Sequence, residues 1–173
     1  SFEKADAQGK KLAMLVGKSL KTSTDTVKKA SLSLRAKTFT LPLENRLFKL
    51  AAILGVIKQG FNGWGMHRSE LAAFTIDEAS FLAFPGEIYP EIVYGGIEAP
   101  EGRDFPVEPL EVPPLITTMP GKYHFIMGLT NDEMGYIIPK SEWDQKKPYL
   151  YGDKSAHYGE SNSLGPETGV IVH

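Results

Sequence analysis

The fold is predicted from one continuous stretch, Glu70-Leu-Ala-Ala-Phe-Thr-Ile-Asp-Glu-Ala-Ser-Phe-Leu-Ala-Phe-Pro-Gly-Glu87. Two runs rich in β-forming residues, 70–76 and 79–84, flank Asp77-Glu78, and this pattern predicts a β-hairpin that turns at that pair. The second strand continues directly into Pro85-Gly86-Glu87. Proline restricts the turn and glycine permits close backbone approach, so we expect the Glu87 carboxylate at the edge of a sheet.

Upstream of the hairpin, the spacing of apolar residues predicts two helices and another strand. Residues 3–20 and 44–56 each follow the helical spacing of one apolar stripe. Residues 31–41 are typical of a strand that ends at Pro42. The apolar positions change phase within that strand, which predicts a bulge near Lys37-Thr38.

The remaining elements are short. Residues 22–25 form a predicted loop of helix-capping residues, and residues 122–127 a predicted strand. Extended structure is expected to restart at 136–138, after the loop 128–135. Pro90 and the run Gly165-Pro166-Glu167 are typical of helix starts.

Residues 97–114 differ in composition from the rest of the chain. Five prolines and five acidic residues accompany a single Arg103 in this segment. Proline excludes a helix or a central strand, so we expect an extended surface excursion, either a lid, a partner contact or an inert loop.

Composition limits the class of protein. The 173 residues are long enough for one domain with its own core, and the net charge of −2 excludes the clustered basic face of a nucleic-acid-binding protein. The absence of cysteine excludes disulfides and thiolate metal ligands. No apolar run is long enough to predict a transmembrane segment. We therefore expect a single domain, 1–173, of the α+β class: a mixed β-sheet of at least four strands, flanked by the helices at 3–20 and 44–56.

Four stretches, in this order, resemble the later part of the catalytic domain of the neutral/alkaline non-lysosomal ceramidases. They are Phe39-Thr-Leu-Pro-Leu-Glu-Asn45, the Pro-Gly-Glu motif, Gly128-Leu-Thr-Asn-Asp-Glu-Met-Gly-Tyr136, and Tyr158-Gly-Glu-Ser-Asn-Ser-Leu-Gly-Pro-Glu-Thr168. The resemblance covers roughly residues 32–173, except the proline-rich excursion. It implies that the chain is the C-terminal portion of a larger catalytic domain. The same interpretation is favoured by the end of the sequence, which comes only seven residues after Pro166.

The resemblance also implies roles for particular residues. Glu87 and Tyr136 would be zinc ligands, and Tyr158 would help to stabilise the oxyanion near the substrate carbonyl. Asn131 and Asp132 would shape the ligand loop. Glu160 would be either a carboxylate behind the ligands or an exposed acid.

Two zinc-binding histidines and a catalytic serine of the family lie earlier in its chain, and nothing here matches that portion. The histidines of this chain show neither His-x-His nor HExxH spacing; they are His67, His124, His157 and His173. No Gly-x-Ser-x-Gly nucleophile motif is present either. The upstream part of the same catalytic domain is therefore an expected partner of this chain.

The resemblance implies a zinc-dependent amidohydrolase of lipid metabolism. Its substrate would be an N-acyl lipid such as the sphingolipid ceramide, cleaved to sphingosine and a fatty acid, and the protein would be secreted or periplasmic. One alternative is a non-enzymatic ceramidase-like domain that binds a partner, through 97–114 for example. Another is an unrelated hydrolase that uses the carboxylates of Glu87 and Glu160.

Overall fold

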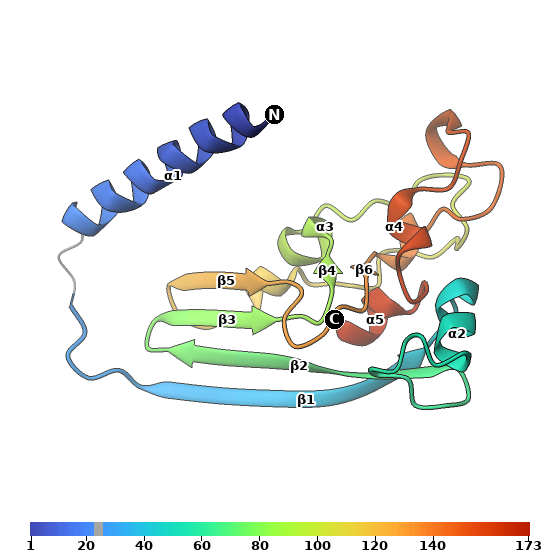
Figure 1. Cartoon of the computed structure of the whole chain (residues 1–173), viewed down its shortest axis with the longest axis horizontal. Coiled ribbons are helices and arrows are strands. Elements are labelled where there is room, and N and C mark those ends of the chain that lie inside the picture. Colours follow the sequence, from blue (N-terminus) through green and yellow to red (C-terminus); the bar gives the residue numbers. More distant parts are fainter. Residues whose placement is uncertain (23–25) are drawn as a thin grey trace. The chain divides into compact units, whose positions relative to one another are not determined.

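A computed structural model describes residues 1–22 and 26–173 (Figure 1). The chain divides into two compact units, Ser1–Ala30 and Ser31–His173, and each is described by itself. The first unit contains helix α1, Phe2–Thr22, which confirms the helix expected at 3–20. Beyond Thr22, the predicted loop of helix-capping residues lies outside the described residues. That both units belong to one catalytic domain stays a prediction.

A four-stranded mixed sheet organises the second unit, and it confirms the expected α+β class. Its strands are β1 (Leu32–Pro42), β2 (Met66–Ile76), β3 (Ala79–Ala83) and β5 (Tyr123–Met127), in the spatial order β1-β2-β3-β5. The first three strands are antiparallel neighbours, whereas β5 runs parallel to β3. The hairpin turn falls at Asp77-Glu78 as predicted, although β2 begins four residues earlier than expected, at Met66.

The predicted bulge near Lys37-Thr38 is wrong. β1 pairs with β2 in one unbroken register, from Leu32 opposite Ile76 to Pro42 opposite Met66. The change of phase has another cause, because the two faces of β1 are apolar at different ends. Leu34 is 71% exposed on one face, whereas Leu41 is fully buried on the other. A strand with exposed apolar residues on one face at its start and buried ones on the other face at its end produces the same sequence pattern as an inserted residue.

The other elements of the second unit are short. They are α2 (Arg46–Ile53), β4 (Glu87–Ile88), α3 (Pro90–Tyr94), η1 (Leu115–Thr117), β6 (Tyr136–Ile137), η2 (Lys140–Glu142), η3 (Leu150–Gly152), α4 (Tyr158–Ser161) and α5 (Thr168–Val172). Pro90 occupies the first turn of α3 as expected. The helix predicted at 44–56 is shorter, because its C-cap is Leu54 and Gly55 then takes a positive φ of 74°.

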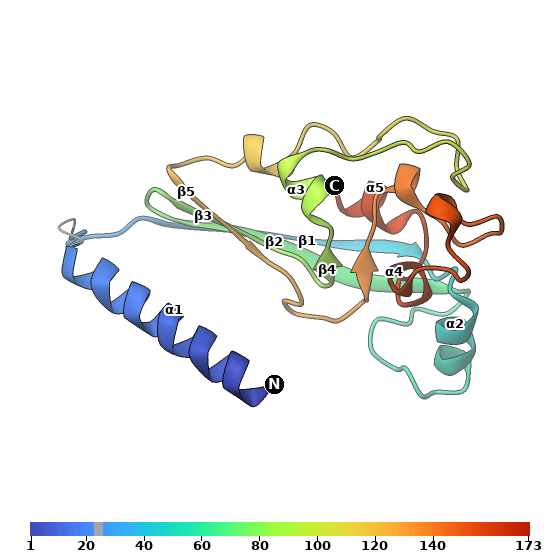
Figure 2. The same ribbon diagram turned by 90° about the horizontal axis from the view of Figure 1, so that it is seen from above.

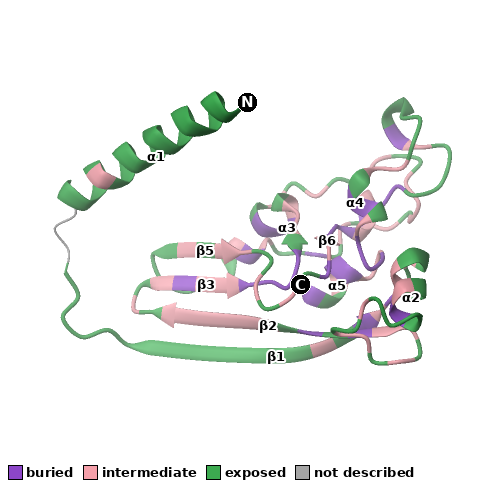
Figure 3. Cartoon of the chain, viewed as in Figure 1, coloured by how far each residue is buried: buried purple, intermediate pink, exposed green. Residues whose placement is uncertain are grey.

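The core of the second unit gathers where the short elements meet the sheet. Figure 3 shows most buried residues around α3, β6 and α5, whereas β1 is exposed over most of its length. The fully buried members of the core cluster include Leu41, Ile92 and Ile137. Ala52 of α2 belongs to this cluster, so α2 packs against the core of the second unit, as expected for the helix predicted at 44–56.

The segment 97–114 contains no helix or strand, as expected from its prolines. It lies on the same side of the sheet as α3 and α5 (Figure 2). It is not wholly a surface excursion, because the Glu111 side chain is fully buried and accepts a 3.0 Å hydrogen bond from Lys140 N. Arg103 also donates to the carbonyls of Ala99, Pro100, Phe105 and Val107, which ties the segment to itself. Within the described part of the chain, no helix is long and apolar enough to cross a membrane.

Candidate functional site

Glu87 and Tyr136 lie side by side, although 48 residues separate them along the chain. β4 and β6 form a small parallel pair in which Glu87 is the register partner of Tyr136. Glu87 N donates to Gly135 O at 2.9 Å, and Tyr89 N donates to Ile137 O at 3.0 Å. The pairing therefore brings together the two side chains for which the resemblance implies zinc binding.

Two glycines permit this close backbone approach. A Cβ at Gly86 would lie 2.4 Å from Gly135 O, and a Cβ at Gly135 would lie 1.9 Å from Asn162 O. Gly135 also has a positive φ of 83°, a conformation that L side chains rarely adopt. The glycine before each predicted ligand is thus required by the geometry of the pair.

Tyr158 joins the pair from a third element, the short helix α4. Its ring meets Tyr136 edge to face, with centroids 5.9 Å apart and planes at 79°. Tyr136 N donates to Asn162 O at 3.0 Å, so the chain around α4 is held against β6. Glu87, Tyr136 and Tyr158 line one cavity of about 250 Å³ together with Leu129 and Glu133.

The Tyr136 hydroxyl and the Glu87 carboxylate interact. The hydrogen bond that Tyr136 donates to Glu87 raises the pKa of the phenol, and burial and the negative charge on Glu87 act in the same direction. A phenol binds a metal as its anion, and a nearby cation lowers its pKa. Two oxygen atoms that interact in this way are suited to bind one cation together.

This donor pair fits part of a zinc site, since zinc takes at least three protein ligands in catalytic sites. None of the four histidines, all of them described, lines the cavity. Among the residues that the structure describes, no group of three or more acidic or histidine side chains is arranged to hold a metal ion. The remaining ligands would therefore have to come from outside these residues.

Asp132 fastens the loop that precedes Tyr136. Its Oδ2 accepts from Ser69 Oγ at 2.9 Å, and its Oδ1 accepts from Gln59 Nε2 at 3.2 Å. His67 Nε2 lies 3.4 Å from the same carboxylate. Asn131, next to Asp132, takes a positive φ of 72°, which asparagine tolerates better than most residues. Both residues hold the loop in shape, and neither lines the cavity of Glu87 and Tyr136.

An adjoining cavity of about 500 Å³ contains His67 and Asp132 in its wall. It shares Phe48, Leu129 and Glu133 with the cavity of the predicted ligands. Its wall is otherwise largely apolar. A largely apolar cavity therefore adjoins the cavity that contains Glu87 and Tyr136.

Glu160 lies elsewhere. It is 2% exposed, and its Oε1 accepts from Asp144 N at 3.3 Å. Burial raises its pKa most, opposed in part by hydrogen bonds and by His157. Glu160 and Glu87 line different cavities, so the hypothesis of a hydrolase built on these two carboxylates has no shared site.

Sequence reasoning missed three residues near the site. Tyr89 packs edge to face on Tyr136 with centroids 6.1 Å apart, and Glu133 and Asn162 line the cavity. Tyr89 could have been found from strand alternation, because it is two residues beyond Glu87. Nothing local in the sequence signals Asn162, whose carbonyl matters through its contact with β6.

Comparison of the chain with protein-family models, with curated proteins and with solved structures found no match.

Proposed function

We propose that this chain is the later part of the catalytic domain of a zinc-dependent amidohydrolase that resembles neutral ceramidase. Such an enzyme cleaves an N-acyl amide, ceramide for example, to a fatty acid and a sphingosine-like amine. The observation that carries the proposal is the convergence of Glu87, Tyr136 and Tyr158 on one cavity from three separate elements. The order of the motifs along the chain does not by itself require these three residues to meet.

Each residue has a chemical task in this proposal. Glu87 and Tyr136 would hold zinc together with ligands from the upstream part of the domain. When bound, zinc would supply a Lewis acid for the amide carbonyl and for water. The side chain of Tyr158 is largely exposed beside Tyr136. Its phenolic hydroxyl would donate a hydrogen bond to the oxygen on which negative charge develops. The apolar cavity beyond Leu129 is suited to the hydrocarbon part of an N-acyl lipid.

The alternative of a partner-binding domain without enzymatic activity has weaker support. It relied on the segment 97–114 as the contact with the partner. Glu111 and Arg103 commit much of that segment to internal hydrogen bonds, which leaves less of it free for a partner.

The test uses the complete protein with its upstream part. Glu87→Gln should abolish both zinc binding and hydrolysis of an N-acyl amide, because a neutral amide replaces the anionic ligand. Tyr158→Phe should keep zinc but lower kcat by about 100-fold, the effect of losing one oxyanion donor. Zinc is measured by elemental analysis and hydrolysis by release of the fatty acid.

Glu133→Gln is the matched control, because Glu133 lines the same cavity without a proposed role in binding zinc. It should retain zinc and most of the activity. Full activity of the Glu87→Gln protein would refute the proposal.

A further inference from the structure

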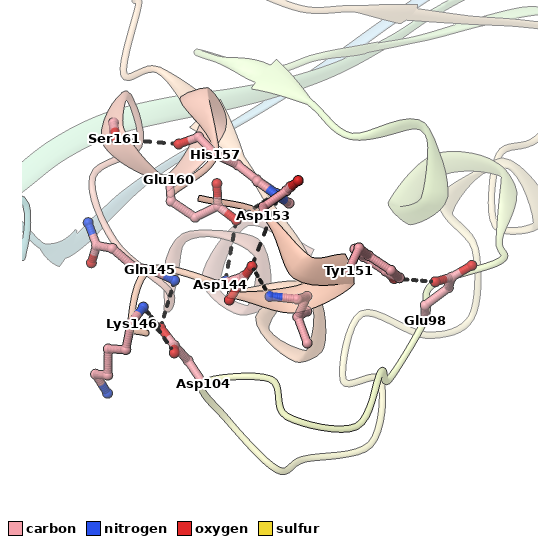
Figure 4. A network of polar contacts seen from close by, with 11 residues as sticks. Glu98, Asp104, Asp144, Gln145, Lys146, Tyr151, Asp153, His157, Glu160 and Ser161 are labelled. Atoms are coloured by element: carbon pink, nitrogen blue, oxygen red, sulfur yellow. Dashed lines mark hydrogen bonds and ion pairs between the residues drawn. The ribbon is translucent and has the colours of Figure 1, made fainter. Parts of the chain in front are cut away.

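A third cavity, of about 230 Å³, is lined by four glutamates from four different segments. They are Glu91 of α3, Glu98, Glu142 of η2 and Glu160 of α4. Among the described residues, no lysine or arginine lines this cavity. His157 is the one basic residue described in its lining, and its Nε2 is already engaged with Asp153 Oδ2 at 2.8 Å (Figure 4). The negative charge is therefore largely unbalanced.

Two of these glutamates have buried oxygens without a partner. Glu160 is 2% exposed, and its Oε2 has no hydrogen-bond partner among the described residues. Glu91 Oε2 is also buried and unpartnered within the same part of the chain. Burying an ionised oxygen without a partner is costly, and a hydrogen-bond donor that reaches either oxygen lowers that cost.

The other two glutamates are held in place by the fold. Glu98 Oε2 accepts from the Tyr151 hydroxyl at 3.0 Å, and Glu142 Oε1 accepts from Glu98 N at 2.7 Å. Each keeps its second carboxylate oxygen free of these contacts. These two acceptors are thus oriented before any ligand binds, as is Glu160, whose Oε1 accepts from Asp144 N.

The titration behaviour of neighbouring groups agrees with this geometry. Burial, followed by the charge on Glu160, raises the pKa of Tyr89 to about 12. Burial also raises the pKa of Glu142, and the charges on Glu91 and Glu98 add to that effect. These carboxylates lie close enough to repel one another.

We propose that this cavity binds a small organic cation that carries a guanidinium or primary ammonium group. Such a group offers several N–H donors to separate carboxylates, and charge-assisted hydrogen bonds of this kind are strong. The rings of Tyr89 and Tyr151 also line the cavity and can attract a cation through their faces.

A bare metal ion fits this cavity less well. A metal needs its ligand oxygens within about 2.6 Å of one point. No three acidic or histidine side chains among the described residues have that arrangement. Carboxylates distributed around a space of about 230 Å³ suit donors that are themselves spread over several atoms.

This site does not depend on the proposed amidohydrolase function. The cavity lined by the four glutamates shares no lining residue with the cavity of Glu87 and Tyr136. Cation binding can be measured on this chain without zinc or substrate, so its result is separate from the test of Glu87.

The test is a calorimetric titration of the 173-residue chain with agmatine, which carries one guanidinium and one primary ammonium group, at constant ionic strength. We expect saturable binding of one agmatine per chain. Glu160→Gln and Glu142→Gln should each weaken it about tenfold or more, since each removes a charged acceptor. Glu108→Gln is the matched control, because the Glu108 side chain is 89% exposed and lies outside the cavity. It should bind agmatine as the parent chain does.

Two further titrations separate the alternatives. Calcium chloride should neither bind stoichiometrically nor displace agmatine, and either result would instead assign a divalent-ion site. A blocked peptide with one internal arginine should bind more weakly than agmatine; tighter binding would assign a partner's side chain and overturn the small-cation proposal. Absence of saturable agmatine binding to the parent chain, or equal weakening by Glu108→Gln, would also overturn it. Near-ultraviolet circular dichroism checks that each variant is folded.

Discussion

Gly135 is the residue on which the candidate site most depends for its geometry. A Cβ there would lie 1.9 Å from Asn162 O, a backbone atom that is itself bonded to Tyr136 N. The position directly precedes Tyr136, so any backbone shift that relieves the clash also moves this predicted ligand. Packing and backbone conformation together require glycine here.

We predict that Gly135→Ala lowers the free energy of unfolding by about 3 kcal/mol or more, from the positive φ and the clash together. Gly152→Ala is the control, because Gly152 has a similar φ of 78° but nothing within 4 Å of an added Cβ. It should cost only about 1 kcal/mol. Urea unfolding of both variants measures the difference, and equal losses would contradict the role of the Asn162 contact.

Glu160 supports a second prediction about a single residue, on the dependence of stability on pH. Burial raises the pKa of Glu160 above its unfolded value, so the folded state favours the protonated acid. Stability from this group is present at low pH and is lost as the pH rises through the folded-state pKa. A glutamine in its place cannot ionise, so the stability of Glu160→Gln relative to the parent should increase as the pH rises above about 4, the range in which an unfolded glutamate ionises.

Urea unfolding at several pH values checks this prediction. Asp144 and His157 face Glu160 and remain in both proteins. Besides the hydrogen bond with Asp153, the charge on Glu160 raises the pKa of His157, and the loss of that effect in the variant acts in the same direction with pH. The exposed Glu108→Gln should show little change with pH. A difference for Glu160→Gln that is constant or shrinks as the pH rises would be the contrary result.

Among the structural elements, α2 and the segment after α4 are both bound by the side chain of Asn45. Asn45 Oδ1 accepts from Leu47 N and Phe48 N and so caps α2. Its Nδ2 donates to Ser161 O and Ser163 O, both at 3.0 Å. One amide therefore begins a helix and also holds the segment whose Asn162 carbonyl contacts β6.

We predict that Asn45→Ala lowers the free energy of unfolding by about 2–4 kcal/mol, the sum of a lost cap and two lost hydrogen bonds. Asn45→Ser should lose roughly half as much, because serine is a good cap but its side chain is too short to replace the amide donors. Denaturant unfolding measures both losses. If the two variants were equally unstable, the hydrogen bonds to Ser161 and Ser163 would not contribute to the free energy of unfolding.

At the scale of the molecule, the hydrophobic core that stabilises the fold lies in the unit Ser31–His173. Every residue of the hydrophobic core cluster belongs to it, beginning with Phe39. The unit also contains the sheet, the three cavities described above and all the predicted site residues. It should therefore fold without the preceding helix.

We predict that a protein of residues 31–173 melts within about 4 °C of the full chain, which corresponds to a loss of no more than about 1–2 kcal/mol. Thermal unfolding followed by circular dichroism measures this. Agmatine binding by the shortened protein provides an independent check of native structure. An unfolded shortened protein would show that residues 1–30 are required for the fold.

Local sequence was sufficient to predict the class of this fold and most of its elements. The hairpin at Asp77-Glu78, the end of β1 at Pro42 and the start of α3 at Pro90 were predictable, because turn chemistry and residue period are local properties. The Pro-Gly-Glu motif also predicted where a carboxylate would be presented.

Which residues meet depends instead on the assembled fold. The phase change in β1 was misread as a bulge because the sequence does not show which face of a strand is covered. The acidic cavity was missed because its glutamates come from four segments that are each ordinary alone. The adjacency of Glu87 and Tyr136 likewise depends on a parallel pairing between distant strands, which no local pattern encodes. The physical reason is the same in each case: burial and pairing are properties of the folded chain, and short-range preferences do not contain them.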